Sequence, residues 1–392
     1  MPVSAAGPIQ AKEFAKSSSP DFKTVRLAGL DGLRGLLALY VAIFHLGGGL
    51  EVKYPAIRMP FIFQHGWYAV DVFFVLSGFV MAHVYGRESS SDEVSFSKYW
   101  RFMSARIARL YPVHLLTATV MLACLLPSLW GTERWLDPEG RYAWTAFVAA
   151  LFMLQGVWID HLTWNYPSWS ISSEFHVYLI APFLIRFIKR KSVAIAAVVF
   201  GVMLPLVIYL LYYPETRFPT NGFVTLLRAI PLFAVGVGVY QLKDLPFWKD
   251  GLLALVVVAC SIALLATPGY SPFALLGVPM LVAVVRAAPR ASALLSTRPL
   301  TFLGEISYSL YMVHALVQII VLNRVVERLP PSLQDRTEVL VVALAGGVVL
   351  SVGLAWLLKH WVEDMARPIV FNYLLRFVRP SKQTVRAESS AG

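Results

Sequence analysis

Long apolar runs recur along almost the whole chain, and they constrain its fold more than any other feature. Runs long enough to cross a bilayer as a helix of about 20 residues begin near Leu30, Gly66, Leu110, Trp169, Val193, Gly222, Gly251, Ser271, Thr301 and Glu338. Of the 392 residues, 57% are hydrophobic and only 15% are charged, which is too apolar for a soluble protein of this size. The sequence therefore predicts an all-α, polytopic membrane protein with about ten transmembrane helices.

The distribution of basic residues indicates whether one further apolar segment, from Tyr142 to Trp158, crosses the membrane. If this segment crossed the membrane, the cluster Lys189, Arg190 and Lys191 would lie outside, against the rule that cytoplasmic loops are rich in basic residues. With ten crossings and both termini cytoplasmic, most lysines and arginines lie inside. We therefore predict a re-entrant or interfacial helix at 142–158 in a multi-pass protein of the plasma (inner) membrane. The net charge of +11 is then explained by basic cytoplasmic loops that are attracted to anionic lipid. It gives no support to nucleic-acid binding.

The chain divides into one membrane domain and two polar ends. Residues 1–29 have no signal-peptide pattern and are expected to form a disordered cytoplasmic tail, residues 30–365 the membrane domain, and residues 366–392 a basic cytoplasmic tail. Cys124 and Cys260 lie inside apolar runs, so we expect core thiols rather than a disulfide. The histidines lack metal-ligand spacing, and we predict no catalytic metal.

Two ionisable residues, Arg34 and His45, interrupt the first apolar run. Such groups are costly inside a membrane and are functional candidates for that reason. A separation of eleven residues is about three helical turns, which places both side chains on one face, roughly 16 Å apart along the axis. The structural alternative is a snorkelling arginine and a hydrogen-bonded histidine packed against a neighbouring helix.

Six blocks of sequence point to a known family. They are DGLRGLLALYVAIFH, GWYAVDVFFVLSGFVMA, SKYWRFMSARIARLYPVHLL, YPSWSISSEFHVYLIAPFLI, FLGEISYSLYMVHA and WVEDMARP. In this order they resemble the successive blocks of the membrane-bound acyltransferase 3 family, which O-acylates sugars and some small molecules. The resemblance implies an enzyme that transfers acyl groups other than aminoacyl groups (EC 2.3.1), with a ten-helix core, cytoplasmic acyl-CoA as donor, and His45 as the catalytic histidine of an Arg-x10-His motif.

The donor would bring a pyrophosphate and a 3′-phosphate, which need cations of planar, multidentate geometry. Arg106 and Arg109 are spaced i, i+3 on one helix face, at a place where the family carries an Arg-x-x-Arg motif. Arg34 is a third candidate, for the phosphates, the pantetheine arm or the thioester oxygen. The alternative for any single arginine is ordinary flanking of a membrane span by basic residues.

His45 is the candidate general base for a sugar hydroxyl that attacks the thioester. Covalent catalysis through an acyl-imidazole is the alternative, and the sequence does not separate the two. Asp71, early in the second apolar run, would orient His45 if the two were paired. A structural salt bridge or a helix N-cap is an equally good interpretation of Asp71.

Five further residues are candidates for the acceptor side. Glu174 and Tyr178 are spaced i, i+4 on one helix face and could position an acceptor hydroxyl, while Trp169 either stacks on a sugar ring or belongs to an aromatic belt at the interface. Tyr311 and His314 share a face of the ninth predicted span. His314 is either a second site histidine or part of a buried hydrogen-bond network.

The expected reaction is O-acylation, with acetyl as the expected group, of a carbohydrate such as a surface polysaccharide or a lipid-linked glycan. Membrane lipids are the other expected partners, and the sequence leaves the oligomeric state open. A transporter or exporter of a glycan or small molecule is the alternative function. It would favour internal repeats and interrupted helices in matching halves, a pattern not found in this sequence.

Overall fold

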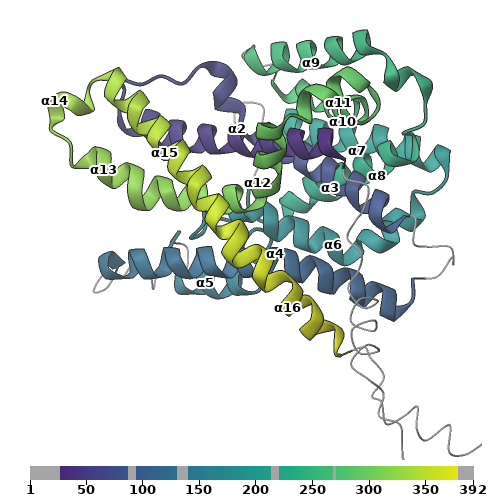
Figure 1. The fold of residues 1–392 in the computed structure, drawn as a ribbon, viewed down its shortest axis with the longest axis horizontal. Coiled ribbons are helices and arrows are strands. Elements are labelled where there is room, and N and C mark those ends of the chain that lie inside the picture. The colour runs from purple at the N-terminus through teal and green to yellow at the C-terminus, as the bar shows by residue number, and fades with distance from the viewer. Residues whose placement is uncertain (1–26, 87–93, 130–139, 213–219, 268–270, 378–392) are drawn as a thin grey trace, which may run out of the picture.

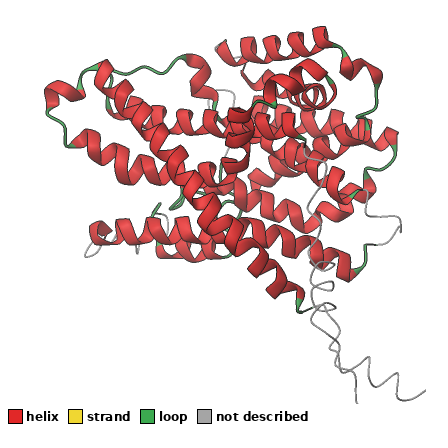
Figure 2. Cartoon of the chain, in the orientation of Figure 1, coloured by secondary structure: helices red, strands yellow, loops and turns green. Residues whose placement is uncertain are grey.

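The computed structural model describes residues 27–86, 94–129, 140–212, 220–267 and 271–377. Every regular element in these ranges is a helix, and the rest is loop (Figure 2). The predicted tail at 1–29 lies outside the described residues except for its last three positions. Of the predicted tail at 366–392, residues 378–392 lie outside them, and the first ten continue in a helix.

The helices follow the apolar runs of the sequence. The long helices are α2 (Ala28–Lys53), α3 (Trp67–Tyr85), α4 (Phe96–Leu129), α6 (Trp169–Phe187), α7 (Lys191–Tyr212), α8 (Leu226–Gln241), α9 (Gly251–Ala266), α12 (Arg298–Leu316) and α15 (Thr337–Leu358). Between and after them lie α5 (Trp144–Leu151), α10 (Val278–Ala287), α11 (Pro289–Leu295), α13 (Asn323–Glu327), α14 (Pro331–Gln334) and α16 (Asp364–Leu375). Two π-helical segments, Val317–Leu322 and Lys359–Glu363, follow α12 and α15 without a break.

The described part of the chain contains seven helices long and apolar enough to cross a membrane. An eighth candidate is the pair Pro272–Ala287 and Pro289–Leu295, which is bent by 90°. Helices α6 and α9 occupy the two remaining positions at which the sequence predicts a span. Helix α5, within the 142–158 segment, has eight residues and a length of about 12 Å, which is too short for a crossing. The chain is a multi-pass membrane protein, and the count of ten remains a prediction.

Helices α3 and α8 lie in the interior, while α7 and α15 present apolar side chains outward. Phe79 on α3 and Phe233 on α8 are fully buried. By contrast, Phe200 on α7 is 72% exposed, and Val349 on α15 is 71% exposed. In a membrane protein such outward apolar side chains contact lipid, so packing rather than burial from water holds these helices in place.

Helices α2 and α12 make the most extensive helix contact in the described structure, and glycines allow their close approach. A Cβ atom on Gly35 would lie 2.4 Å from the Gly304 backbone nitrogen and 2.7 Å from the Leu300 oxygen. A Cβ atom on Gly304 would lie 2.2 Å from the Asp31 oxygen. Small residues at such crossings let helix backbones touch, as in other membrane bundles.

A buried ion pair joins α3 to α8. The Nε of Arg228 donates to Asp71 Oδ1 at 2.5 Å, its Nη2 donates to the Trp67 oxygen at 3.1 Å, and both charged side chains are only 1% exposed. The guanidinium also lies 5.5 Å from the ring centroid of Trp169. The expected pairing of Asp71 with His45 is therefore replaced by the alternative interpretation, a structural salt bridge.

Replacing Gly35 with alanine is expected to lower stability by about 1–3 kcal/mol, because the added methyl group meets the backbone of α12 rather than a movable side chain. The measurement is thermal unfolding of the purified protein in detergent. The matched control is Gly346→Ala on α15, where a Cβ atom meets nothing within 4 Å. An equal effect of the two substitutions would contradict the tight α2–α12 contact.

Removing either Asp71 or Arg228 leaves the other charge buried, so Asp71→Ala or Arg228→Ala is expected to destabilise the protein by about 3–5 kcal/mol. The double replacement Asp71→Leu with Arg228→Met removes both charges and is expected to be less destabilising than either single substitution. Unfolding in detergent measures all three. Single variants as stable as the wild type would show that the ion pair carries no structural role.

Candidate functional site

A cavity of about 350 Å³ lies among helices α2, α3, α4, α6, α12 and α16. Its lining includes six of the residues expected to be functional, namely Arg34, Arg106, Arg109, Glu174, Tyr178 and Tyr311. These residues come from four helices that are far apart in sequence. The fold therefore gathers the candidate donor-binding arginines and part of the candidate acceptor set into one place.

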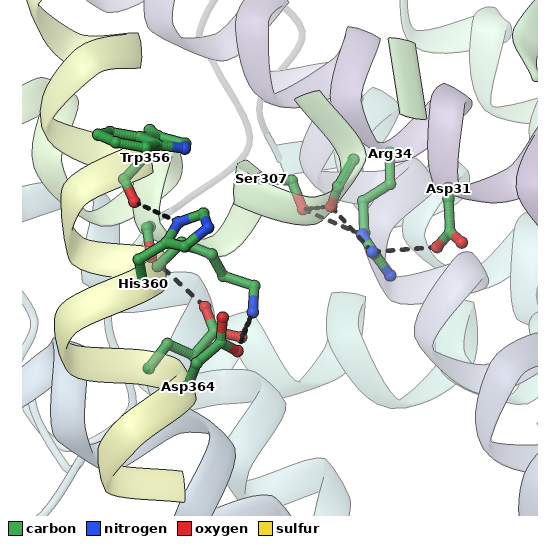
Figure 3. Close-up of polar contacts among 10 residues, drawn as sticks. Asp31, Arg34, Ser307, Trp356, His360 and Asp364 are labelled. Carbon is green, nitrogen blue, oxygen red and sulfur yellow. Dashed lines mark hydrogen bonds and ion pairs between the residues drawn. The ribbon is translucent and has the colours of Figure 1, made fainter. Parts of the chain in front are cut away.

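Arg34 is fixed at the cavity wall by partners on two helices. Its Nε donates to Ser307 Oγ at 3.0 Å, its Nη2 donates to the Gly304 oxygen at 2.9 Å, and Asp31 Oδ1 lies 3.1 Å from Nη2. Figure 3 shows the guanidinium of Arg34 between Asp31 and Ser307. The side chain is 26% exposed, so it is anchored while part of it still faces the cavity.

Arg106 is almost fully buried, at 4% exposed, in a setting made of aromatic rings. Its guanidinium carbon lies 5.8 Å from the ring centroid of Tyr85, 5.9 Å from that of Phe102 and 5.7 Å from that of Tyr178. One nitrogen, Nη2, makes a long hydrogen bond of 3.4 Å to the Tyr85 hydroxyl. The buried Nε and Nη1 atoms have no protein partner, and a buried donor without an acceptor is costly. An anionic ligand in the cavity would satisfy both.

Arg109 lies one turn after Arg106 on α4 and lines the same cavity. It is less buried than Arg106. The i, i+3 spacing therefore does place both guanidinium groups on the face of α4 that lines the cavity, as the sequence predicts. Arg101, one turn earlier, lies outside this lining and is exposed.

Glu174 and Tyr178 of α6 meet Ser77 of α3 in the same cavity. Glu174 Oε1 accepts hydrogen bonds from Ser77 Oγ at 2.7 Å and from the Tyr178 hydroxyl at 2.5 Å, and the two hydroxyl oxygens lie 2.9 Å apart. The Tyr178 ring in turn contacts the Arg106 guanidinium. The predicted Glu174 and Tyr178 pair is therefore next to a donor-binding candidate rather than on a separate acceptor side.

His45 and His314 form a hydrogen-bonded pair across the α2–α12 contact. His45 Nδ1 lies 2.9 Å from His314 Nε2, and the two rings are nearly parallel with centroids 5.0 Å apart. His314 Nδ1 lies 3.1 Å from the Leu310 carbonyl oxygen, which can only accept. In a neutral His314 ring, Nδ1 then carries the hydrogen, and Nε2 accepts from His45 Nδ1. The lone pair of His45 is thereby placed on Nε2.

Tyr311 connects the cavity to this histidine pair. It lines the cavity, and its ring centroid lies 5.7 Å from that of His314. Its hydroxyl is 2.6 Å from Ser170 Oγ and donates to the Pro167 oxygen at 2.9 Å. On the other side of the pair, Tyr166 stands edge-on to His45, with ring centroids 5.0 Å apart. His45 and His314 themselves do not belong to the cavity lining.

Two predicted site residues, Asp71 and Trp169, lie elsewhere. Asp71 is paired with Arg228, and Trp169 is buried with its ring against the same guanidinium. Neither lines the cavity. Asp71 is therefore not the partner of His45 in this structure, since that position belongs to His314. The signal for the actual pair was present in the sequence, because Arg228 and Asp71 are intramembrane charges of opposite sign.

Sequence reasoning missed several residues of the cavity. Four cavity residues, Ser77, His83, Ser307 and Arg367, were not predicted to be site residues. Ser307 precedes Tyr308 in a block that resembles the family, so its position was a usable signal. Within the described residues, no group of three or more His, Cys, Asp or Glu side chains is arranged to hold a metal ion.

Comparison with known proteins identifies relatives among acyltransferases. The chain is 32% identical over 181 residues to acyltransferase MdmB of Streptomyces mycarofaciens, covering 44% of this chain and 42% of that protein. It is 24% identical over 327 residues to peptidoglycan O-acetyltransferase OatA of Listeria monocytogenes, covering 73% of this chain and 48% of that protein. Protein 2 in the picA locus of Rhizobium radiobacter is 33% identical over 184 residues, 43% of this chain and 88% of that protein.

The chain thus spans less than half the length of the MdmB and OatA proteins it matches. No solved structure matches it significantly. The model of the acyltransferase 3 family, described as an acyltransferase domain, matches residues 27–360. This match covers most of the chain and includes the cavity helices α2, α3, α4, α6 and α12, so the protein belongs to the acyltransferase 3 family.

Proposed function

We propose that this protein is an integral membrane O-acyltransferase that moves an acyl group, expected to be acetyl, from acyl-CoA to a hydroxyl group of a carbohydrate. Family membership supports acyl transfer, and the name of one relative, a peptidoglycan O-acetyltransferase, supports a glycan acceptor. The proposed domain for this reaction is residues 30–365. The observation that carries the donor assignment is Arg106, a buried cation with two unsatisfied donor atoms at the cavity wall.

Coenzyme A suits this cavity because its phosphates are the kind of ligand that guanidinium groups bind by paired hydrogen bonds. Arg106 and Arg109 stand on adjacent turns of α4. Arg34 already has Asp31, Ser307 and Gly304 as partners. It is therefore proposed to contact the pantetheine arm or the thioester oxygen, while the two α4 arginines hold the phosphates.

His45 is proposed as the general base, with His314 as the residue that orients it. The acceptor hydroxyl oxygen attacks the thioester carbonyl carbon, and its proton passes to His45 Nε2. The carbon–sulfur bond then breaks, and the proton is returned to the leaving thiolate to give free coenzyme A. Burial of His314, which is 0% exposed, disfavours a charged ring there and supports the neutral tautomer that leaves His45 Nε2 basic.

The proposed topology places the donor on the cytoplasmic side and the acceptor on the outer side. It comprises ten crossings, with both termini inside, in the plasma membrane. The separation along α2 between Arg34 and His45, roughly 16 Å, supports this layout because it sets the base about three turns deeper than the proposed donor contacts. Transfer to a glycan beyond the bilayer then starts from a thioester presented within the membrane.

Replacing His45 with alanine is expected to reduce acyl transfer about 10²–10⁴-fold, the usual contribution of a general base. With purified protein in lipid nanodiscs, the release of free thiol from acetyl-CoA measures the reaction. In host cells that express each variant, mass spectrometry of the surface glycan measures acylation of the acceptor. His360→Ala, an exposed histidine on the segment after α15, is the control and is expected to retain activity.

The same assay tests the orientation of His45. His314→Phe is expected to slow transfer, whereas His314→Gln is expected to restore part of the rate, because the amide oxygen can accept from His45 Nδ1. Full activity in a folded His45→Ala protein would overturn the mechanism. Acetyl attached to His45 in the absence of acceptor would favour the acyl-imidazole route over general base catalysis.

Arg106→Lys is expected to raise the KM for acetyl-CoA about tenfold or more, since lysine keeps the charge but loses the planar fork. Arg106→Ala is expected to raise it further. The KM for acetyl-CoA, measured with acceptor in excess, reports the effect. Arg101→Ala is the matched control, because it removes the same charge from an exposed position on the same helix. If lysine restored wild-type KM, Arg106 would act only as a point charge.

A further inference from the structure

The last long helix continues well past the end of the family match at residue 360. Helix α15, the π-helical segment Lys359–Glu363 and α16 form one rod over residues 337–375, which crosses the front of the molecule obliquely in Figure 1. At 39 residues it is about 58 Å long, roughly twice the thickness of the hydrocarbon core. A rod of this length that crosses the layer directly would therefore extend beyond it.

Helix α16 is docked along α4, the helix that carries Arg106 and Arg109. Phe371 of α16 is buried against Ala105 and Ala108 of α4. At the far end of the contact, Trp100 Nε1 donates to the Leu374 oxygen at 2.9 Å. The outward face of α16 carries apolar side chains such as Ile369, which is 68% exposed, so docking on α4 fixes which face of α16 points inward.

That docking brings Arg367 to the wall of the cavity. Its side chain is half-buried and lines the same cavity as Arg106 and Arg109, so three like charges surround one space, and Glu363 lies one helical turn before it. The acids of the cavity lining have other partners. Asp31 lies against Arg34, and Glu174 accepts from two hydroxyl groups.

A cluster of like charges around one cavity attracts an anion of matching charge. The donor carries three phosphate groups, two in the pyrophosphate and one at the 3′ position, whereas α4 supplies only two arginines. We infer that Arg367 is a third phosphate-binding arginine of the donor site, supplied by a helix that begins beyond residue 360. This inference rests on the proposed acyl-CoA donor.

The experiment measures binding of coenzyme A by calorimetry to the full-length protein in lipid-free detergent micelles, so that no lipid phosphate competes. Arg367→Ala is expected to weaken binding about tenfold or more, the equivalent of one charge-assisted hydrogen bond, without a change in the unfolding temperature. Arg367→Lys is expected to restore part of the affinity. Arg376→Ala, an exposed arginine directly after the end of the helical rod, is the matched control and is expected to bind within twofold of wild type.

A second variant tests whether the docking of α16 positions the arginine. Phe371→Ala is expected to weaken coenzyme A binding, whereas Ile369→Ala, on the outward face, is expected to leave it unchanged. Repeating the Arg367→Ala measurement with 3′-dephospho-CoA identifies the contact. A loss of affinity that disappears with this ligand assigns Arg367 to the 3′-phosphate, and a loss that persists assigns it to the pyrophosphate.

Two outcomes would count against the inference and are distinguishable. Wild-type affinity in Arg367→Ala, with weakened binding in Arg106→Ala, would overturn the role of Arg367 and leave the proposed donor intact. Failure of the wild-type protein to bind coenzyme A at all, while folded, would overturn both this inference and the proposed donor.

Discussion

The close contact between α2 and α12 is the constraint on which the rest of the site depends. Gly35 and Gly304 let the two backbones approach each other, and the polar contacts of the site then form along that seam. Near the start of α2, Arg34 donates to the Gly304 oxygen. About three turns further along α2, His45 contacts His314. Residue numbers rise together along both helices, so the two helices are parallel. A shift in this contact would separate both polar pairs at once.

The buried charges of this protein serve two different ends. Asp71 and Arg228 are paired with each other and tie α3 to α8, with neither side chain exposed beyond 1%. Arg106 is buried to a similar degree but keeps two donor atoms without a protein acceptor. Because an unsatisfied buried cation is costly, its persistence in a cavity is better explained by a ligand than by stability. A carboxylate faces Arg228, whereas aromatic rings face Arg106. The nature of the facing group, rather than burial alone, therefore separates the structural charge from the proposed binding one.

Much of this arrangement could be predicted from the sequence, since hydropathy located the helices and motif spacing identified Arg34, His45, Arg106 and Arg109. Helical periodicity states which residues share a face, but not which helix that face meets. Pairing of Asp71 with His45 and a structural salt bridge were therefore equally good interpretations, and the actual partner, Arg228, is 157 positions away. The sequence also did not predict that the helix continues through Pro368. A π-helical segment before this proline shifts the backbone hydrogen bonds, and such a segment cannot be predicted from amino-acid composition.

Tyr311 sets the remaining physical requirement of the proposed reaction. It lines the cavity and its ring contacts that of His314, so Tyr311 lies between the cavity that is proposed to hold the thioester and the histidine pair. Its hydroxyl is held by Ser170, in the first turn of α6, and by the oxygen of Pro167, just before that helix. Helix α6 also carries Glu174 and Tyr178. The position of Tyr311 therefore depends on the first turn of α6 and on the segment that precedes it.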